Sequence, residues 1–63
     1  MRGEIKSYSY TKGYGFIKSE VGELFFRYFD CNNNSRKLKE GRKVIFLPIE
    51  SSKGLRATDV TII

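Results

Sequence analysis

Closely spaced turn signals are the feature that most restricts how this chain can fold. Glycine, asparagine and serine residues, which favour turns, divide it into five short segments: residues 2–10, 14–19, 23–28, 42–50 and 55–62. Each segment is rich in Tyr, Phe, Ile, Val or Thr, the residues that suit a pleated strand. Short strands at this spacing predict an all-β barrel or sandwich rather than a βαβ unit. The best helix candidate, residues 35–40, is long enough for only one turn.

Length and composition indicate one small globular domain. With 63 residues, of which 40% are hydrophobic and 30% charged, the chain has the composition of a folded protein and is too short for a second domain. We therefore expect a single domain over residues 1–63. No apolar run approaches the ~20 residues of a membrane-spanning helix, and the N-terminus lacks the apolar segment of a signal peptide. These features predict a cytoplasmic protein.

Cysteine and histidine counts exclude several kinds of site. Cys31 is the only cysteine and histidine is absent, so the sequence offers neither an intramolecular disulfide nor the usual ligands of a zinc site. A Ser-His-Asp or Cys-His catalytic arrangement is missing for the same reason. Carboxylates are present, but a barrel this small has little room for a water-excluding cleft around two of them. We therefore expect no enzymatic activity and no cofactor, and a buried apolar role for Cys31.

Charge and aromatic residues are distributed unequally along the chain, whose net charge is +5. Residues 1–31 hold eight of the nine aromatic residues, with five basic and four acidic side chains. Residues 32–63 hold seven basic side chains and three acidic ones. The basic run between Arg36 and Lys43 fits a solvated loop, and beside an aromatic surface it would also extend the field that attracts phosphates.

The stretch from Lys12 to Ile17, KGYGFI, carries the strongest functional signal. Side chains of a strand alternate between faces, and a hairpin around residues 20–22 aligns this stretch with residues 23–28. One face then shows Tyr14, Phe16, Phe25 and Arg27, and the other shows Ile17, Leu24 and Phe26. Because a barrel has one interior, we expect the second set in the core and the first on an outer surface. Aromatic rings beside Lys6 and Lys12 suit single-stranded nucleic acid, which offers both flat bases and phosphates.

KGYGFI and the later LFFRYF resemble the two ribonucleoprotein motifs of the cold-shock domain family, which read approximately KGFGFI and VFVHF. Three further blocks, GEIK at residues 3–6, LKEG with the following Val44 and Phe46, and KGLRATDVT at residues 53–61, resemble other parts of the family pattern. The resemblance covers essentially the whole chain. It implies a five-stranded antiparallel OB-type barrel that binds single-stranded RNA and DNA largely without sequence preference. Members of the family act as RNA chaperones and transcription antiterminators.

The resemblance also implies a set of binding residues. It matches Lys6 and Lys12 to lysines that contact the nucleic-acid backbone, and Lys53 to a basic residue of a late loop. Tyr8 matches an aromatic residue of the first strand. The stacking aromatics of the two motifs correspond to Tyr14, Phe16, Phe25 and Tyr28. With two basic replacements added, the predicted nucleic-acid-binding site is Lys6, Tyr8, Lys12, Tyr14, Phe16, Phe25, Arg27, Tyr28, Lys53 and Arg56.

Several positions depart from the family pattern. Ser7 stands where the family usually has an exposed Trp, and Tyr10, three residues later, is the candidate replacement. Arg27 replaces a His, and a guanidinium both stacks on a base and contacts phosphate. Leu55 and Arg56 replace a Pro-Gln pair. These changes shift the expected binding from stacking toward charge.

The segment 42–50 is apolar on both faces. We expect Val44 and Phe46 in the core. That leaves three aliphatic side chains outside: Ile45, Leu47 and Ile49. We expect the C-terminal Ile62 and Ile63, or a long basic side chain, to cover them, which predicts a monomer; a weak dimer is the alternative. Pro48 cannot donate to a strand ladder, so it belongs at an edge or a bulge.

A second class of function stays open at this point. A barrel of SH3-like shape with an aromatic groove would bind proline-rich peptides, and such a groove would carry acidic residues beside its aromatics. The groove expected here is basic. The sequence therefore favours a single-stranded nucleic-acid partner, with no membrane and no small-molecule cofactor.

Overall fold

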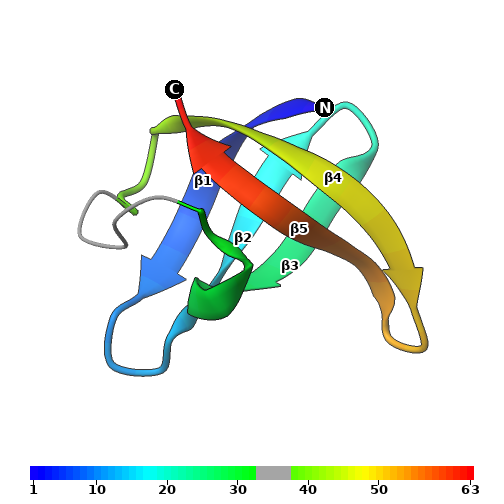
Figure 1. Cartoon of the computed structure of the whole chain (residues 1–63), viewed down its shortest axis with the longest axis horizontal. Helices are drawn as coiled ribbons and strands as arrows, with labels where there is room; N and C mark the ends of the chain where they lie inside the picture. The colour runs from blue at the N-terminus through cyan, green and yellow to red at the C-terminus, as the bar shows by residue number, and fades with distance from the viewer. Residues whose placement is uncertain (33–37) are drawn as a thin grey trace.

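The structure, a computed structural model, describes residues 1–32 and 38–63. Its elements in chain order are β1 (Arg2–Ser9), β2 (Tyr14–Ser19), β3 (Gly22–Arg27), the 3₁₀ helix η1 (Tyr28–Asp30), β4 (Lys43–Ser51) and β5 (Gly54–Ile62). The strands form a closed barrel in the order β1-β2-β3-β5-β4 (Figure 1). The predicted five-stranded barrel is confirmed. Within the described residues, no helix is long and apolar enough to cross a membrane.

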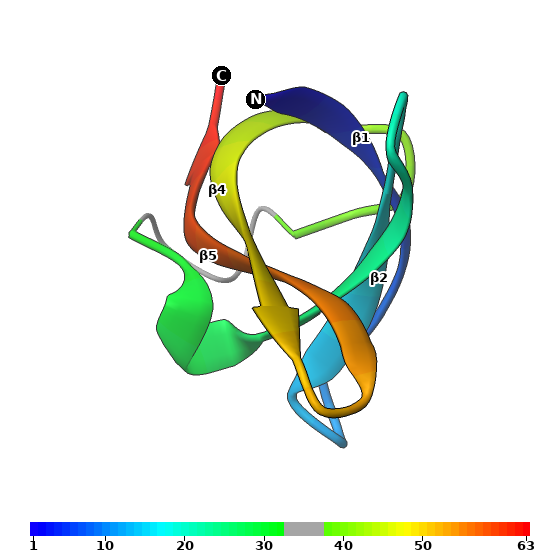
Figure 2. The same ribbon diagram turned by 90° about the vertical axis from the view of Figure 1, so that its right-hand side faces the viewer.

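Strand β1 closes one side of the barrel because it pairs with two neighbours. Its first residues lie antiparallel to β4, with Arg2 opposite Ile45, and its later residues lie antiparallel to β2. The other closure is a short parallel contact between β3 and β5, with Phe25 opposite Arg56. Figure 2 shows β4 and β5 running side by side to their shared turn. All strand ladders are antiparallel except the short one between β3 and β5.

The core follows the predicted alternation of side chains. The buried hydrophobic residues are Ile5, Ile17, Leu24, Phe26, Leu38, Val44, Phe46, Ala57 and Val60. They come from all five strands and from the segment that precedes β4. Burial of these side chains is the main favourable term in the stability of the barrel. It leaves the opposite faces of β2 and β3 on the outside.

A bulge in β1 changes the direction of its later side chains. Ile5 lies opposite Ile17, but the next paired residue is Ser7, opposite Phe16, so Lys6 is the extra residue. The bulge turns Tyr8 toward the interior, where its ring stacks on Phe26 with centroids 5.7 Å apart. Such a shift reverses the alternation for every residue that follows it.

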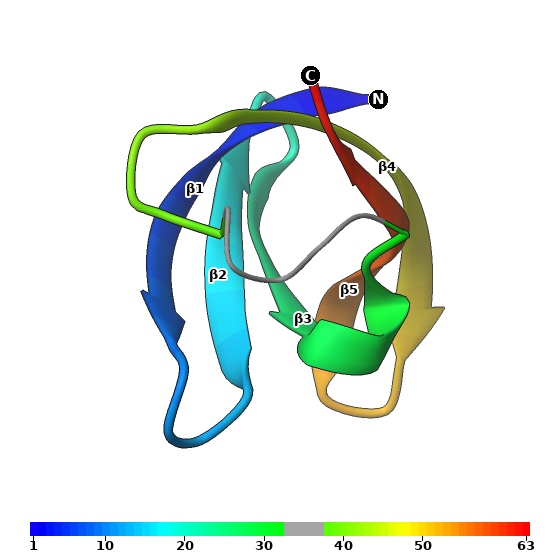
Figure 3. The ribbon, with the colours of Figure 1, turned by 60° about the vertical axis from the view of Figure 1, so that its left-hand side comes forward.

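The path of the chain after β3 differs from the sequence prediction. Tyr28 does not end a strand but begins η1, because the Arg27 amide donates to the Asp30 carboxylate at 3.0 Å and the chain turns. Figure 3 shows η1 against the lower part of β5.

The predicted helix at residues 35–40 is wrong over its described part. Residues 35–37 lie outside the described residues, and residues 38–40 are not helical. The chain after them is tied to β1, since the Gly41 amide donates to the Ile5 carbonyl and the Ile5 amide donates to the Arg42 carbonyl. The segment forms a turn before β4 instead, in which the Arg42 amide donates to the Lys39 carbonyl at 3.1 Å and Gly41 has a φ of 90°.

The expectation that the apolar outer side of β4 is covered is also wrong. Ile45, Leu47 and Ile49 are 38%, 55% and 41% exposed. Ile62 packs against the core instead, and Ile63 is itself 56% exposed.

Candidate nucleic-acid interface

Tyr14, Phe16 and Phe25 form one cluster, the aromatic face, on the outside of β2 and β3. Phe16 lies directly opposite Phe25 in the ladder. Their ring centroids are 5.8 Å apart at 67°, and the Tyr14 ring is 5.4 Å from Phe25. All three residues are half-buried. The outer set predicted from side-chain alternation therefore exists as a connected aromatic surface.

A groove extends the aromatic face toward the β4–β5 turn. Its volume is about 490 Å³. Its lining residues are Phe16, Phe25, Arg27, Ser51, Ser52, Lys53, Leu55 and Arg56. The Arg27 guanidinium lies over the Phe25 ring, 5.3 Å from its centroid, in the geometry of a cation–π contact. The groove thus combines flat apolar rings with cationic side chains.

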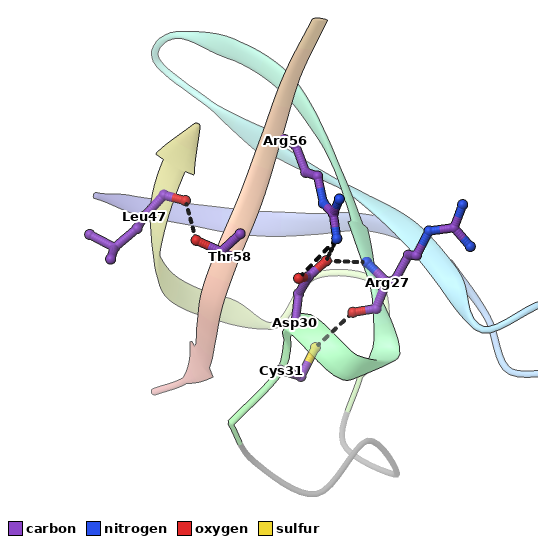
Figure 4. A network of polar contacts seen from close by, with 6 residues as sticks. All are labelled: Arg27, Asp30, Cys31, Leu47, Arg56 and Thr58. Carbon is purple, nitrogen blue, oxygen red and sulfur yellow. Dashed lines mark hydrogen bonds and ion pairs between the residues drawn. The ribbon is translucent and has the colours of Figure 1, made fainter. Parts of the chain in front are cut away.

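Arg56 lies in the groove wall with its charge already paired (Figure 4). Its Nη2 donates to both carboxylate oxygens of Asp30, at 3.1 and 3.2 Å, and its guanidinium lies 5.8 Å from the Phe29 ring centroid. The Asp30 side chain is only 8% exposed and that of Arg56 30%. Arg56 therefore forms part of the groove wall, and its charge is paired with Asp30 rather than available to a phosphate.

Lys6 occupies a different part of the surface. It is the bulged residue of β1, and its Nζ donates to the Glu23 carboxylate at 2.6 Å. Both side chains are about half exposed, 52% and 51%, and exposed pairs of this kind are weak. A phosphate could therefore replace Glu23 as the partner of Lys6.

A second acidic residue of β1 is held by lysines. Glu4 accepts from Lys43 at 2.8 Å and lies 4.0 Å from the Lys18 Nζ. The hydrogen bond and charge of Lys43 lower the pKa of Glu4. Lys43 and Lys18 are thereby partly neutralised on this side of the barrel.

Tyr8 and Tyr10 lie where the sequence alone did not place them. The bulge turns Tyr8 inward, and burial raises the pKa of its hydroxyl. Tyr10 contacts the edge of Tyr8, with ring centroids 4.9 Å apart at 85°. Ser7 remains opposite Phe16. Tyr10 therefore does not fill the position left by the missing Trp.

The structure divides the predicted site residues into groups. Five line the groove: Phe16, Phe25, Arg27, Lys53 and Arg56. Tyr8, Lys12 and Tyr28 line a separate hollow near the β1–β2 turn. Tyr14 belongs to the aromatic face between these groups, and Lys6 stands apart. The basic run at 36–43 is described only in part, because residues 36 and 37 lie outside the described residues.

Sequence reasoning missed several residues of this surface. These are Phe29, Asp30, Ser51, Ser52 and Leu55. Phe29 and Asp30 gave no signal, because the fold alone brings them together with Arg56, which lies 26 positions from Asp30. The serines and Leu55 gave no signal, because they line the groove through the bend of the β4–β5 turn.

The described part of the chain holds one free cysteine, Cys31. The half-buried Cys31 thiol packs against the core, and burial raises its pKa to about 11. Across residues 1–32 and 38–63, no three His, Cys, Asp or Glu side chains gather as metal ligands.

Comparisons with known proteins point to one family. Residues 1–63 match the model of the 'Cold-shock' DNA-binding domain. The major cold shock protein of Streptococcus pyogenes serotype M1 is 36% identical over 62 residues, covering 95% of this chain and 92% of the relative. The major cold shock protein CspA of Pseudomonas aeruginosa is 35% identical over 63 residues, covering 97% and 91%. The solved structure of drosophila Unr CSD456 is similar with a TM-score of 0.76 and 25% identity, over 98% of this chain and 26% of that one.

Proposed function

The chain belongs to the cold-shock domain family of nucleic-acid-binding proteins, and we propose that it binds single-stranded RNA or DNA by base stacking. Bases would stack on Tyr14, Phe16 and Phe25, while basic side chains contact the phosphates. The family consists of binders rather than enzymes, in agreement with the expectation that this chain has no catalytic activity. The proposed unit is the single domain over residues 1–63, acting in the cytoplasm.

The observation that carries the proposal is the connected aromatic face beside a cationic groove. Three rings from two paired strands share one outer surface, although aromatic side chains normally contribute to the core. Each base stacked on such a ring is worth about 1–3 kcal/mol. Arg27 and Lys53 line the same groove and supply the charge that phosphates need.

This kind of binding supports a role as an RNA chaperone or transcription antiterminator. Stacking on a ring depends little on base identity, so many sequences would be bound with similar strength. A base held on Phe16 or Phe25 is withdrawn from pairing. Binding would therefore melt weak hairpins, and the measurable consequence is faster opening of a fluorophore–quencher RNA hairpin when the protein is added.

The protein-interaction alternative has no comparable support. The groove is lined by three cationic residues and by no carboxylate among the described residues. The acid that pairs with the groove residue Arg56, Asp30, is almost fully buried. A groove of this charge does not match the acidic specificity residues expected of a proline-rich-peptide binder.

The direct test is a titration of labelled single-stranded RNA and DNA against the protein and two variants. Phe16→Ala should weaken binding by about 1–3 kcal/mol, the cost of one lost stack, and should leave the fold intact because Phe16 lies outside the core. Val21→Ala is the control, because Val21 is 46% exposed in the β2–β3 turn and lines none of the groove. It should bind like the unmodified protein. Failure of the unmodified protein to bind either strand would reject the proposal.

A further inference from the structure

The molecule has a second aromatic hollow, at the end of the barrel where the β1–β2 turn approaches η1. We call it the tyrosine hollow. Its lining residues are Tyr8, Tyr10, Thr11, Lys12, Gly13 and Tyr28, so three of the four tyrosines of the chain contribute to it. Its volume of about 320 Å³ lies at the lower end of the range for pockets that hold small molecules.

Two of its walls are fixed by packing. Tyr8 stacks on the buried Phe26 ring at 17° between planes, and Tyr10 meets Tyr8 edge-on. The third ring, Tyr28, is held by its backbone, whose amide donates to the Gly13 carbonyl at 2.9 Å. Gly13 lies directly under this ring, since a Cβ built on it would be 3.1 Å from Tyr28 Cδ1.

The turn that carries Lys12 is also held in place. The Gly13 amide donates to the Ser9 carbonyl at 2.7 Å, and the Lys12 amide donates to the Ser9 hydroxyl at 3.2 Å. The Lys12 ammonium makes no ion pair within residues 1–32 and 38–63. A preorganised hollow loses less entropy when it binds, and this one has an unpaired cation at its rim.

Two of the three rings of the tyrosine hollow, those of Tyr10 and Tyr28, are open to solvent. Tyr10 is 54% exposed and Tyr28 is 59% exposed, whereas a ring placed for core packing would be buried. Exposed aromatic rings beside a cation suit a flat group that carries negative charge. A nucleobase attached to its phosphate has this chemistry.

A third, smaller hollow of about 240 Å³ joins the tyrosine hollow to the groove. Its lining residues are Ser7, Tyr8, Ser9, Lys12, Tyr14, Gly15 and Phe16. It shares Phe16 with the groove, and Tyr8 and Lys12 with the tyrosine hollow. Small residues in its wall, including Ser7 where the family usually has Trp, leave the surface open between the two. The three hollows therefore form one track from the β4–β5 turn to η1.

We propose that Tyr10 is a further base-stacking residue of this chain, in the tyrosine hollow that the predicted binding residues Tyr8, Lys12 and Tyr28 also line, with Lys12 as the phosphate contact of the same base. The inference rests on the proposed single-strand binding and adds a place where the bound strand continues. It also assigns a role to Tyr10. This residue does not replace the missing Trp beside Phe16, but extends the site at its far end.

The test is a length series of oligothymidylates, covering about 4 to 16 nucleotides as found for OB folds, against four proteins. These are the unmodified protein, Tyr10→Ala, Tyr10→Phe and the surface control Val21→Ala. Long oligomers should lose at least about fivefold in affinity for Tyr10→Ala, the lower end of one lost stack. The shortest oligomers, bound on Phe16 and Phe25, should bind unchanged. Tyr10→Phe keeps the ring and should restore the affinity for long oligomers.

A local probe gives an independent measurement. The chain contains no Trp, so Tyr10→Trp introduces a single indole whose fluorescence reports on this hollow. Long oligomers should quench it and the shortest should not. An equal loss at all lengths for Tyr10→Ala, or an unchanged affinity at all lengths, would overturn this role of Tyr10 while single-strand binding stands. Absence of binding by the unmodified protein at every length would reject the proposed function together with the role of Tyr10.

Discussion

Asp30 joins two parts of the site through one nearly buried carboxylate. It accepts the Arg27 amide that starts η1, and it pairs with the Arg56 guanidinium in the groove wall. The Arg56 Nε is buried and has no hydrogen-bond partner in the described structure, so the guanidinium is held mainly by Asp30 and by Phe29. The acid thereby sets both the direction of η1 and the position of a groove cation.

Replacing the charge of Asp30 should lower the stability of the fold and add a phosphate contact to binding. Asp30→Asn keeps an oxygen for the Arg27 amide but loses the charge facing Arg56, so unfolding should become easier by about 1–3 kcal/mol. Arg56, released from its partner, should add roughly one phosphate contact and steepen the salt dependence by about 0.7 in log K against log salt. Urea denaturation and a salt titration measure the two effects.

The matched control is Glu23→Gln, which removes the same charge from the exposed pair with Lys6. It should cost less than about 1 kcal/mol. An equal loss of stability in both variants would mean that the buried Asp30–Arg56 pair contributes no more to stability than the exposed Lys6–Glu23 pair.

At the scale of elements, the approach of β1 to β2 decides where the aromatic side chains point. Gly15 lies opposite Tyr8, and a Cβ built on Gly15 would clash with the Ser7 carbonyl oxygen and lie 2.9 Å from the Tyr8 Cα. Both obstacles are backbone atoms, which cannot move without separating the strands. The glycine between Tyr14 and Phe16 is therefore required by the close approach of β1.

Gly15→Ala should accordingly destabilise the barrel by about 1–3 kcal/mol, the usual cost of forcing extra volume into a packed site. Gly22→Ala is the comparison, because its Cβ would meet nothing within 4 Å and the only cost comes from its φ of 109°. The free energies of unfolding from urea denaturation measure both. A Gly15→Ala protein as stable as the parent would show that β1 and β2 are farther apart than described here.

The limits of the sequence prediction lie in the same region. The alternation of residues 14–28 and the apolar composition of the segments predicted the barrel, the core side of β2 and β3, and the aromatic face. The bulge at Lys6 could not be predicted from alternation, because one extra residue reverses the faces of Tyr8 and Ser9 without changing the sequence pattern. Tyr10 follows this bulge, so its direction was also open. The Asp30–Arg56 pair joins residues 26 positions apart through the fold alone.

The outer side of β4 shows a second consequence of strand geometry. Met1 and Phe46 exchange two backbone hydrogen bonds of 2.8 Å, so the polar backbone groups of Phe46 face β1. By alternation those of Pro48 face the same way, beyond the end of β1 pairing. Pro48 has no N–H to offer to another strand there, which is a common protection of an open edge. The exposed Ile45, Leu47 and Ile49 therefore lie beside an edge that resists strand addition.

At the scale of the whole molecule, charge acts together with stacking. The net charge is +5, and Lys12, Arg27 and Lys53 line the continuous track. If these three residues and Lys6 each meet one phosphate of a single strand, log K should fall with log salt at a slope of about −3. Stacking is nearly independent of salt, so the slope reports the charge contribution alone.

Arg27→His tests the part of this charge that lies beside the aromatic face. Near neutral pH a histidine with its usual pKa of about 6.5 is mostly uncharged, so the slope should become shallower by about 0.7, one phosphate contact. Affinity at high salt should change little, because an imidazole still stacks on a base. An unchanged slope would show that Arg27 contacts no phosphate and serves the groove through its contact with Phe25.

The most direct measurement of single-strand stacking compares one labelled oligonucleotide with its own duplex at moderate salt. Paired bases keep their flat faces inside the double helix, and the described structure has only the three-residue η1 as a helix, too short to read a major groove. Both forms carry phosphates, so charge alone would favour the duplex, whose charge density is higher. The account predicts that the single strand binds much more tightly than the duplex, and that Phe16→Ala reduces this preference. Equal or tighter binding of the duplex would contradict it.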